Sequence, residues 1–265
     1  MNTCKVISVI NFKGGVGKTT VTFNLGAELA RRGEKVLLID FDGQGNLSQL
    51  AGVENYDKTI ITALYDVMKG EADKICDNLI SSVLDGLDII PCNIEKEKWL
   101  NEALTSLSRE TIFRRFIDKT GIKNRYDYIL IDNAPSINLD FQNSLVASDE
   151  YLIVTEAEIA STGGIKTVYE IIKQIREYFN LGLKPCGIII NKAMVNTNLH
   201  IAVSGFIHNL WEDDIHIFKQ VIPRTVTMGE LSLYNLPICV YKPNSKQAEV
   251  FSNIADEMLN QEAEN

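Results

Sequence analysis

The sequence has few of the residues that mark secreted, zinc-binding or membrane proteins. Its cysteines show no Cys-x-x-Cys pair, which argues against a disulfide framework or a structural metal site. No apolar run reaches the roughly 20 residues that a membrane-spanning helix needs. The chain starts with one lysine, a short apolar stretch and then glycines, so it predicts a first strand and not a signal peptide. We therefore expect a cytoplasmic protein with reduced thiols at Cys4, Cys76, Cys92, Cys186 and Cys239.

Basic residues are also in deficit. The chain carries 26 Lys and Arg against 35 Asp and Glu, a formal net charge of −9. This balance does not favour nucleic-acid binding, although a local basic patch can still provide it. Hydrophobic residues make up 45% of the 265 residues, which is ample for a large core. Because no repeat, low-complexity segment or Pro/Gly/Ser linker divides the chain, we predict a single domain over residues 1–265.

Apolar runs rich in β-branched residues alternate with longer amphipathic stretches along the chain. A run that is apolar on both faces is typical of a strand in a parallel sheet covered by helices. The alternation therefore predicts an α/β fold, with a doubly wound, mostly parallel sheet and helices on both faces. The predicted strands are 5–11, 35–40, 87–91, 126–132, 150–155, 184–191 and 217–223, and the predicted helices include 21–32, 138–147, 164–179 and 244–260.

A glycine-rich stretch, VINFKGGVGKTT, includes the end of the first predicted strand and runs into a predicted helix. Strand, glycine-rich turn and helix are the context in which backbone N–H groups bind phosphate at a helix N-terminus. Gly14, Gly15 and Gly17 would let those N–H groups face inward. Lys18 would then reach the β- and γ-phosphates of a nucleotide, and the Thr19 hydroxyl would bind Mg²⁺.

This stretch departs from the ordinary phosphate-binding pattern, which has a glycine where this chain has Phe12, and it contains a further lysine, Lys13. The string KGGVGKTT resembles the deviant Walker A motif of the ParA/MinD family of P-loop ATPases. In that family, a lysine at the position of Lys13 reaches across a two-fold interface to the ATP held by the partner subunit. The resemblance implies a homodimer with ATP sandwiched between its subunits. In such a dimer Lys13 stabilises the charge that develops during phosphoryl transfer.

Two further motifs extend the resemblance. LLIDFDGQGNLSQ resembles the family's switch I, which implies that Asp42 orients the attacking water and that Asp40 supports the metal shell or the P-loop. Gly43 replaces the usual proline of this motif, which we interpret as a looser turn. YILIDNAPSINL resembles the Walker B and switch II segment, although the two residues after Asp132 depart from the usual pair. The match implies that Asp132 holds Mg²⁺ through a water molecule.

The remaining motifs concern recognition of the adenine base of the nucleotide. IIIN, ending at Asn191, is similar to the family's adenine-recognising strand end. IPRTVTMGE resembles a segment whose backbone, around Pro223 and Thr225 here, packs against adenine. The resemblance thus implies an ATPase that uses ATP and Mg²⁺ and releases ADP and phosphate. The implied catalytic residues are Lys13, Lys18 and Asp42, the nucleotide-binding residues are Lys13, Gly14, Gly15, Val16, Gly17, Lys18, Thr19, Thr20, Asn191, Pro223 and Thr225, and the metal-binding residues are Thr19, Asp40 and Asp132.

The family serves more than one purpose. Its partition members hold non-specific DNA as ATP dimers and release it when a centromere-binding, ParB-like partner stimulates hydrolysis, whereas its MinD-like members bind membrane through a basic amphipathic C-terminal helix. After Lys246 this chain has no Lys or Arg and several acidic residues, so anionic lipid would repel it, and we expect the apolar stripe within 250–259 to pack in the core. Our leading hypothesis is an ATPase for plasmid, mobile-element or chromosome partition, without the N-terminal DNA-reading domain of larger plasmid members. The alternative is a MinD-like or other positioning switch that binds only proteins.

Sequence features relevant to DNA binding point in both directions. Residues 193–218, which should form a surface helix and a loop, contain no Lys or Arg. Residues 215–246 carry four basic residues against one acid, and residues 109–125 carry six against two. Dimerisation doubles each patch, so we predict ATP-dependent, non-specific duplex binding and association with the nucleoid. The predicted contacts are Arg224, at the centre, with Lys219 and Lys246.

Overall fold

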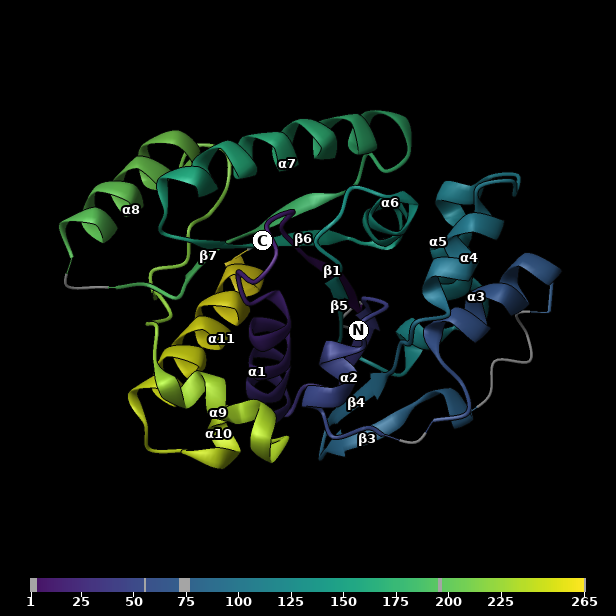
Figure 1. Ribbon diagram of the computed structural model, residues 1–265, viewed down its shortest axis with the longest axis horizontal. Helices are drawn as coiled ribbons and strands as arrows, with labels where there is room; N and C mark the ends of the chain where they lie inside the picture. The colour runs from purple at the N-terminus through teal and green to yellow at the C-terminus, as the bar shows by residue number, and fades with distance from the viewer. Residues whose placement is uncertain (1–3, 55, 72–76, 195–196, 265) are drawn as a thin grey trace.

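A computed structural model describes residues 4–54, 56–71, 77–194 and 197–264 (Figure 1). Within these residues, seven strands form one sheet in the order β3-β4-β2-β5-β1-β6-β7 once they are numbered along the chain. The first two strands in that order pair antiparallel, and the other neighbouring pairs are parallel, which confirms the predicted doubly wound sheet. The strands are β1 (Lys5–Ile10), β2 (Val36–Phe41), β3 (Ser81–Leu84), β4 (Leu87–Ile90), β5 (Tyr128–Asn133), β6 (Glu150–Glu156) and β7 (Lys184–Asn191).

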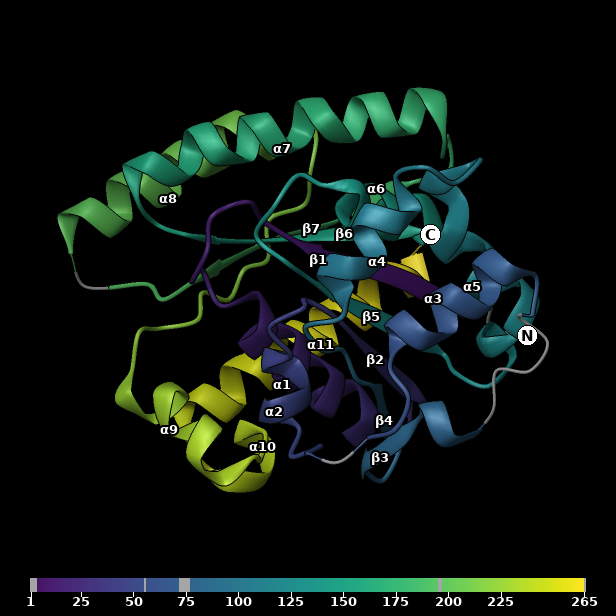
Figure 2. The same ribbon diagram turned by 45° about the vertical axis from the view of Figure 1, so that its right-hand side comes forward.

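Helices cover both faces of the sheet, as Figures 1 and 2 show. They are α1 (Lys18–Arg31), α2 (Asn46–Leu50), α3 (Ile60–Lys69), α4 (Lys96–Ala103), α5 (Ile112–Thr120), α6 (Leu139–Ala147), α7 (Ile159–Tyr178), α8 (Asn198–Trp211), α9 (Val226–Tyr234), α10 (Ile238–Tyr241) and α11 (Lys246–Glu264). One face packs against α1, α2, α9, α10 and α11. The other face packs against α3, α4 and α5 near β2 and against α6, α7 and α8 near β7.

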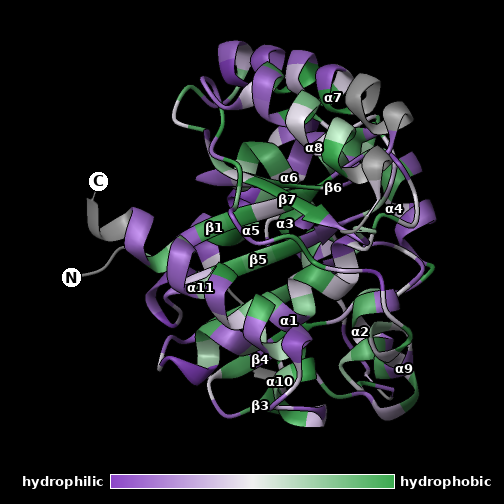
Figure 3. Cartoon of the chain, turned by 90° about the vertical axis from the view of Figure 1, so that its left-hand side faces the viewer, coloured by the Kyte–Doolittle hydropathy of each residue, from purple (hydrophilic) through white to green (hydrophobic). Residues whose placement is uncertain are grey.

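The strands are apolar on both sides because each side meets a layer of helices. In β6, Leu152 and Val154 belong to the core beneath α1 and α11. Tyr151 and Ile153, which alternate with them, belong to the core beneath α6 and α7. Figure 3 shows this arrangement as hydrophobic strands between helices whose outer surfaces are more hydrophilic.

The apolar stripe near the C-terminus is core, as predicted. In α11, Val250, Phe251, Ile254, Ala255 and Met258 are all buried. They join the same core cluster as the buried residues of α1. No helix in the described ranges is long and apolar enough to cross a membrane.

Several expectations about elements need correction. Residues 217–223 do not form a continuous strand, because their pairing is reduced to two isolated bridges, from Ile217 to Ile188 in β7 and from Pro223 to Ala193 just beyond it. Between these bridges the register is lost, because the Phe218 N–H donates to the Ile188 carbonyl oxygen and the Ile222 N–H to that of Ile190, so four residues of this segment advance for two of β7. Helix α7 begins at Ile159, before the expected residue 164. The antiparallel edge strand β3 and the helices α3 to α5 were not anticipated. Cys4, Cys92, Cys186 and Cys239 are buried and form no disulfide, and Cys76 lies outside the described residues.

Candidate active site

The motif residues meet at the carboxyl edge of the sheet, where ligands bind in doubly wound folds. The P-loop follows β1, which neighbours the central strand β5, and Asp40 in β2 is paired in register with Asp132 in β5. A cleft of about 680 Å³ opens at this edge. Its walls include Lys18 and Thr19 from the P-loop, Asp42 from the loop after β2, and one side of α9.

The P-loop adopts the predicted strand, turn and helix. Gly15 and Gly17 have left-handed φ values of 76° and 91°, and Gly17 is the N-cap of α1. A Cβ atom at Gly17 would lie 2.2 Å from Nδ2 of Asn191, so glycine is required there by space as well as by conformation. Lys18 is 7% exposed. Burial lowers the pKa of its ammonium group, while the negative charges of Asp132 and Asp42 oppose that shift.

The end of β7 supports this loop from the side. Asn191 donates from Nδ2 to the carbonyl oxygen of Val16 at 2.7 Å. Lys192, which has a left-handed φ of 52°, donates to the carbonyl oxygen of Gly15 and lies 3.3 Å from the Glu156 carboxylate. Asn191, assigned by sequence to adenine recognition, therefore holds the P-loop with its amide nitrogen. Its contact with adenine stays a prediction.

Two buried aspartates lie beneath the cleft, and their surroundings differ. Asp132 is fully buried, and neither of its carboxylate oxygens has a hydrogen-bond partner among the described residues. Burial and the neighbouring Asp40 raise the pKa of Asp132 to about 7, while Thr19 and Lys18 oppose that shift. An unpaired buried carboxylate beside a threonine hydroxyl offers the oxygen ligands that Mg²⁺ prefers. This part of the site therefore fits a magnesium ion.

The second aspartate, Asp40, holds the loop that follows β2. Its Oδ2 accepts hydrogen bonds from the N–H of Ser48 at 2.8 Å and from the Ser48 hydroxyl at 2.7 Å, and its Oδ1 accepts the N–H of Asp42 at 3.1 Å. Burial raises the pKa of Asp40 to about 6, against the effect of these bonds. With its oxygens bonded in this way, Asp40 fits a supporting role better than that of a direct metal ligand.

Asp42 is in a well-packed turn. Its Oδ1 accepts the N–H of Gln44 at 3.0 Å, and its carbonyl oxygen accepts the N–H of Gly45 at 2.9 Å. A Cβ at Gly43 would lie 3.3 Å from the Cβ of Lys96. The turn at Gly43 is therefore hydrogen-bonded and closely packed, and not looser as the sequence suggested.

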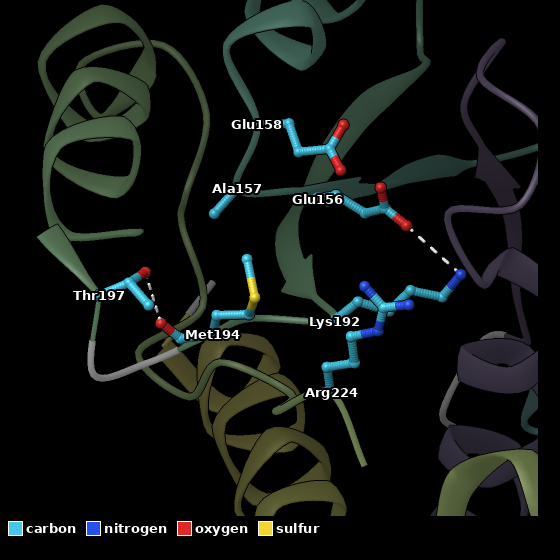
Figure 4. Close-up of a pocket in the computed structure, with 7 residues that line it drawn as sticks. All are labelled: Glu156, Ala157, Glu158, Lys192, Met194, Thr197 and Arg224. Atoms are coloured by element: carbon cyan, nitrogen blue, oxygen red, sulfur yellow. Dashed lines mark hydrogen bonds and ion pairs between the residues drawn. The ribbon is translucent and has the colours of Figure 1, made fainter. Parts of the chain in front are cut away.

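Lys13 points to carboxylates of its own chain in the single protomer. Its Nζ lies 3.0 Å from Glu156 Oε2 and 2.6 Å from Glu158 Oε2, and the hydrogen bond to Glu158 raises its pKa. Figure 4 shows these two glutamates with Lys192 and Arg224 around a neighbouring pocket of about 400 Å³. The sequence analysis missed both glutamates. They form the acidic pair in TEAE at the end of a predicted strand, and this pair could have indicated them.

The other predicted residues lie at different distances from the cleft. Pro223 is bridged to Ala193 just beyond β7, and Thr225 is the N-cap residue of α9, one wall of the cleft. Lys219 and Lys246 are exposed away from it, on and near α11. The structure thus brings together the predicted phosphate and metal residues and leaves the predicted DNA contacts spread over a wider surface.

Comparison with known proteins shows which family the chain belongs to. A family model described as an AAA domain matches residues 4–185. The sporulation initiation inhibitor protein Soj of Bacillus subtilis is 35% identical over 254 residues, covering 96% of this chain and 98% of Soj. The chromosome partitioning protein ParA of Caulobacter vibrioides is 30% identical over 261 residues, covering 98% and 96%. The chain belongs to the ParA/MinD-type family of P-loop ATPases.

Solved structures lead to the same family. The cell division ATPase MinD of Pyrococcus furiosus superposes with a TM-score of 0.76 at 29% identity, covering 98% of this chain and 100% of that one. MinD of Pyrococcus horikoshii, complexed with Mg-ADP, superposes with a TM-score of 0.74 at 28% identity, covering 96% and 95%. The protein is thus a ParA/MinD-type ATPase, and the resemblance inferred from its deviant Walker A motif is confirmed.

Proposed function

We propose that this ParA/MinD-type ATPase is an ATP-dependent dimer switch in the partition of a plasmid, mobile element or chromosome. The observation that carries the proposal is that relatives named for chromosome partition match nearly the whole chain. We also propose that residues 1–265 act as a single ATPase domain. One sheet runs from β1 to β7, and α11 packs back onto α1, which supports that view.

The cleft is suited to Mg-ATP. Lys18 and the inward-facing N–H groups of the P-loop would bind the β- and γ-phosphates, and the Thr19 hydroxyl with the Asp132 carboxylate would hold Mg²⁺. When bound, the metal ion neutralises charge on the phosphate oxygens. Asp40 supports the site by holding the loop after β2 through Ser48.

Hydrolysis to ADP and phosphate needs an oriented water and a stabilised transition state. Asp42 faces the cleft from its hydrogen-bonded turn, where its carboxylate would orient the attacking water. Lys13 would leave Glu156 and Glu158 and reach the phosphates of the partner subunit in the ATP dimer. Once the dimer has formed, Lys13 would already be in place, so the charge that develops during transfer is stabilised without further reorganisation of the site.

For the output of the switch, we propose non-specific DNA binding, association with the nucleoid, and release by a centromere-binding, ParB-like protein. Arg224, Lys219 and Lys246 are exposed and can contact phosphate. In contrast, Lys242 is neutralised by Glu230 at 3.0 Å and is a poorer contact. Pairing two copies doubles the number of cations and so makes binding dependent on ATP.

The test uses Asp42→Ala protein, trapped as an ATP dimer, with random-sequence duplex at low and physiological salt. We expect binding that needs ATP and Mg²⁺ and whose log K falls by about 0.9 per neutralised phosphate for each tenfold rise in salt. Adding Arg224→Ala removes one cation from each subunit of the dimer, so it should weaken binding and reduce that slope by about 2, or about 1 per subunit. Adding Lys35→Ala is the matched control, because exposed Lys35 directly precedes β2 at the opposite edge of the sheet.

The alternative function is a positioning switch that binds only proteins. It is favoured by the shared pocket in which Arg224 lies with Glu156 and Glu158, since the two carboxylates offset the arginine charge. The absence of Lys and Arg from residues 193–218 points the same way. A trapped dimer that ignores DNA even at low salt would exclude the partition proposal in favour of this alternative.

A further inference from the structure

A buried ion pair contacts the loop after β2 and belongs to none of the motifs above. Lys96, the first residue of α4, is 2% exposed, and Asp140, in the first turn of α6, is 3% exposed. The Lys96 ammonium forms an ion pair with the Asp140 carboxylate and donates a hydrogen bond to the carbonyl oxygen of Phe41. It also lies 5.0 Å from the centre of the Phe41 ring. The lysine thus connects three segments that are far apart in the sequence.

Stability alone is a poor explanation for such a pair. Removing a lysine and an aspartate from water is costly, and their mutual attraction repays that cost only partly. Apolar residues of similar volume often stabilise a protein as well as a buried ion pair does. The ion pair instead contributes orientation, because it holds a charged hydrogen-bond donor against one particular carbonyl oxygen.

That carbonyl belongs to the peptide unit that leads into Asp42. Lys96 binds the oxygen of the Phe41–Asp42 peptide, and Asp40 Oδ1 accepts the N–H of the same peptide at 3.1 Å. Because a peptide unit is planar, holding its oxygen and its hydrogen fixes the orientation of the whole unit. Lys96 on one side and Asp40 on the other therefore hold the peptide unit that ends at the Asp42 Cα, the atom that carries the side chain.

The glycine after Asp42 makes this arrangement possible. A Cβ at Gly43 would lie 3.3 Å from Lys96 Cβ and 3.6 Å from both Lys96 Cδ and the Asn93 carbonyl oxygen. A larger residue at this position would push against the aliphatic part of the lysine. Gly43 and Lys96 thus fit each other, and the glycine lets the lysine lie against the turn.

The second partner of Lys96 connects this loop to another one. Asp140 is on α6, which begins after the loop that follows β5 and Asp132. We propose that Lys96 is a positioning residue for hydrolysis, which orients Asp42 through the Phe41 carbonyl and, through Asp140, ties the loop after β2 to the loop after β5. The inference rests on the proposed role of Asp42 in orienting water.

The test compares Lys96→Met with wild type in ATP binding, thermal unfolding and single-turnover hydrolysis. Misorienting a catalytic group by about 1 Å costs on the order of 100-fold. We expect kcat to fall by about 10- to 100-fold, while the Kd for ATP changes by less than about threefold. Lys98→Met is the matched control on the same helix, because Lys98 is exposed and makes only a surface ion pair, at 4.0 Å, with Glu102. This control should hydrolyse ATP at the wild-type rate.

A second variant separates positioning from folding. Lys96→Met with Asp140→Leu replaces the ion pair by an apolar pair that can pack without leaving a buried charge. It should melt near the wild-type temperature and still hydrolyse ATP slowly, because no donor reaches the Phe41 carbonyl. A folded double variant with wild-type kcat would overturn the inference. The inference would also be overturned if weaker ATP binding or partial unfolding fully accounted for the loss of rate in Lys96→Met.

Asp42→Ala distinguishes this inference from the function on which it rests. Undiminished hydrolysis in Asp42→Ala would remove the proposed role of Asp42, and the positioning role with it. Slow hydrolysis in Asp42→Ala together with a normal rate in Lys96→Met would leave the role of Asp42 in place and reject only the role of Lys96.

Discussion

Replacing Asp132 by Asn should make the nucleotide-free protein less sensitive to alkaline pH. Asp132 is fully buried without a hydrogen-bond partner among the described residues, and burial with the nearby Asp40 raises its pKa to about 7. An unfolded aspartate titrates near about 3.9. Between these two values the folded state holds a proton that the unfolded state has lost, so raising the pH destabilises the folded protein.

The size of the effect follows from the same values. Each pH unit between the two pKa values costs about 1.4 kcal/mol, and about two such units lie between pH 5 and pH 7. Above pH 7 both states are ionised and the cost stays constant. Wild type should therefore lose about 3 kcal/mol through Asp132 between pH 5 and pH 8, which corresponds to about 6 to 12 °C in Tm at 2 to 4 °C per kcal/mol. In the variant, the free energy of unfolding keeps the smaller dependence on pH that comes from Asp40, whose pKa is raised to about 6.

The assay is thermal unfolding in EDTA, without nucleotide, at intervals from pH 5 to pH 8. The Tm of wild type should fall more steeply with pH than that of Asp132→Asn, whose uncharged side chain has no ionisation to suppress. Asp42→Asn is the matched control, because it removes an only partly buried carboxylate from the same edge of the sheet. Parallel pH profiles for wild type and Asp132→Asn would refute the reasoning, since the carboxylate would then be ionised at no cost.

Three further variants test the site. Lys13→Ala should bind a fluorescent ATP analogue through Lys18 and release no phosphate, and an ATP-bound wild type that sediments as a strict monomer would contradict the role assigned to Lys13. Asp42→Ala should accumulate as a stable ATP dimer in sedimentation, with little turnover. Gly17→Ala should lose nucleotide binding in calorimetry, because φ is 91° and its Cβ would meet the amide at the end of β7 at 2.2 Å. Gly33→Ala shares the left-handed φ but has nothing within 4 Å, so it should cost only about 1 to 2 kcal/mol and keep binding.

The parts of the site that sequence predicted are local. Strand, glycine turn and helix follow one another within residues 5–31, so their order on the chain determines their arrangement in space. Asp40 and Asp132 each occur at the end of an apolar run, and the carboxyl ends of neighbouring parallel strands meet at one edge. The fold class and the phosphate site were therefore accessible from pattern alone.

The parts that sequence missed depend on contacts between distant segments. The partners of Lys13 are about 143 residues away, and no periodicity indicates such a pairing. The strand predicted at 217–223 failed because the segment loses its register with β7 between Phe218 and Ile222, which a local β-pattern does not reveal. The hairpin of β3 and β4 is different, because Asp85 and Gly86 are a recognised two-residue turn signal that went unused.

The resting contacts of Lys13 suggest how dimerisation can affect the P-loop. Pairs between partly exposed groups contribute only about 0.2 to 1 kcal/mol each, so Glu156 and Glu158 hold Lys13 weakly and the phosphates of a partner-bound ATP can displace them. Glu156 also contacts Lys192, whose ammonium group binds the Gly15 carbonyl oxygen in the P-loop. When Lys13 leaves, Lys192 no longer shares Glu156 with a second cation. In the dimer that we propose, transfer of Lys13 to the partner would therefore strengthen the ion pair next to the P-loop of the subunit that supplies it, and each subunit's nucleotide site would respond to the presence of the other.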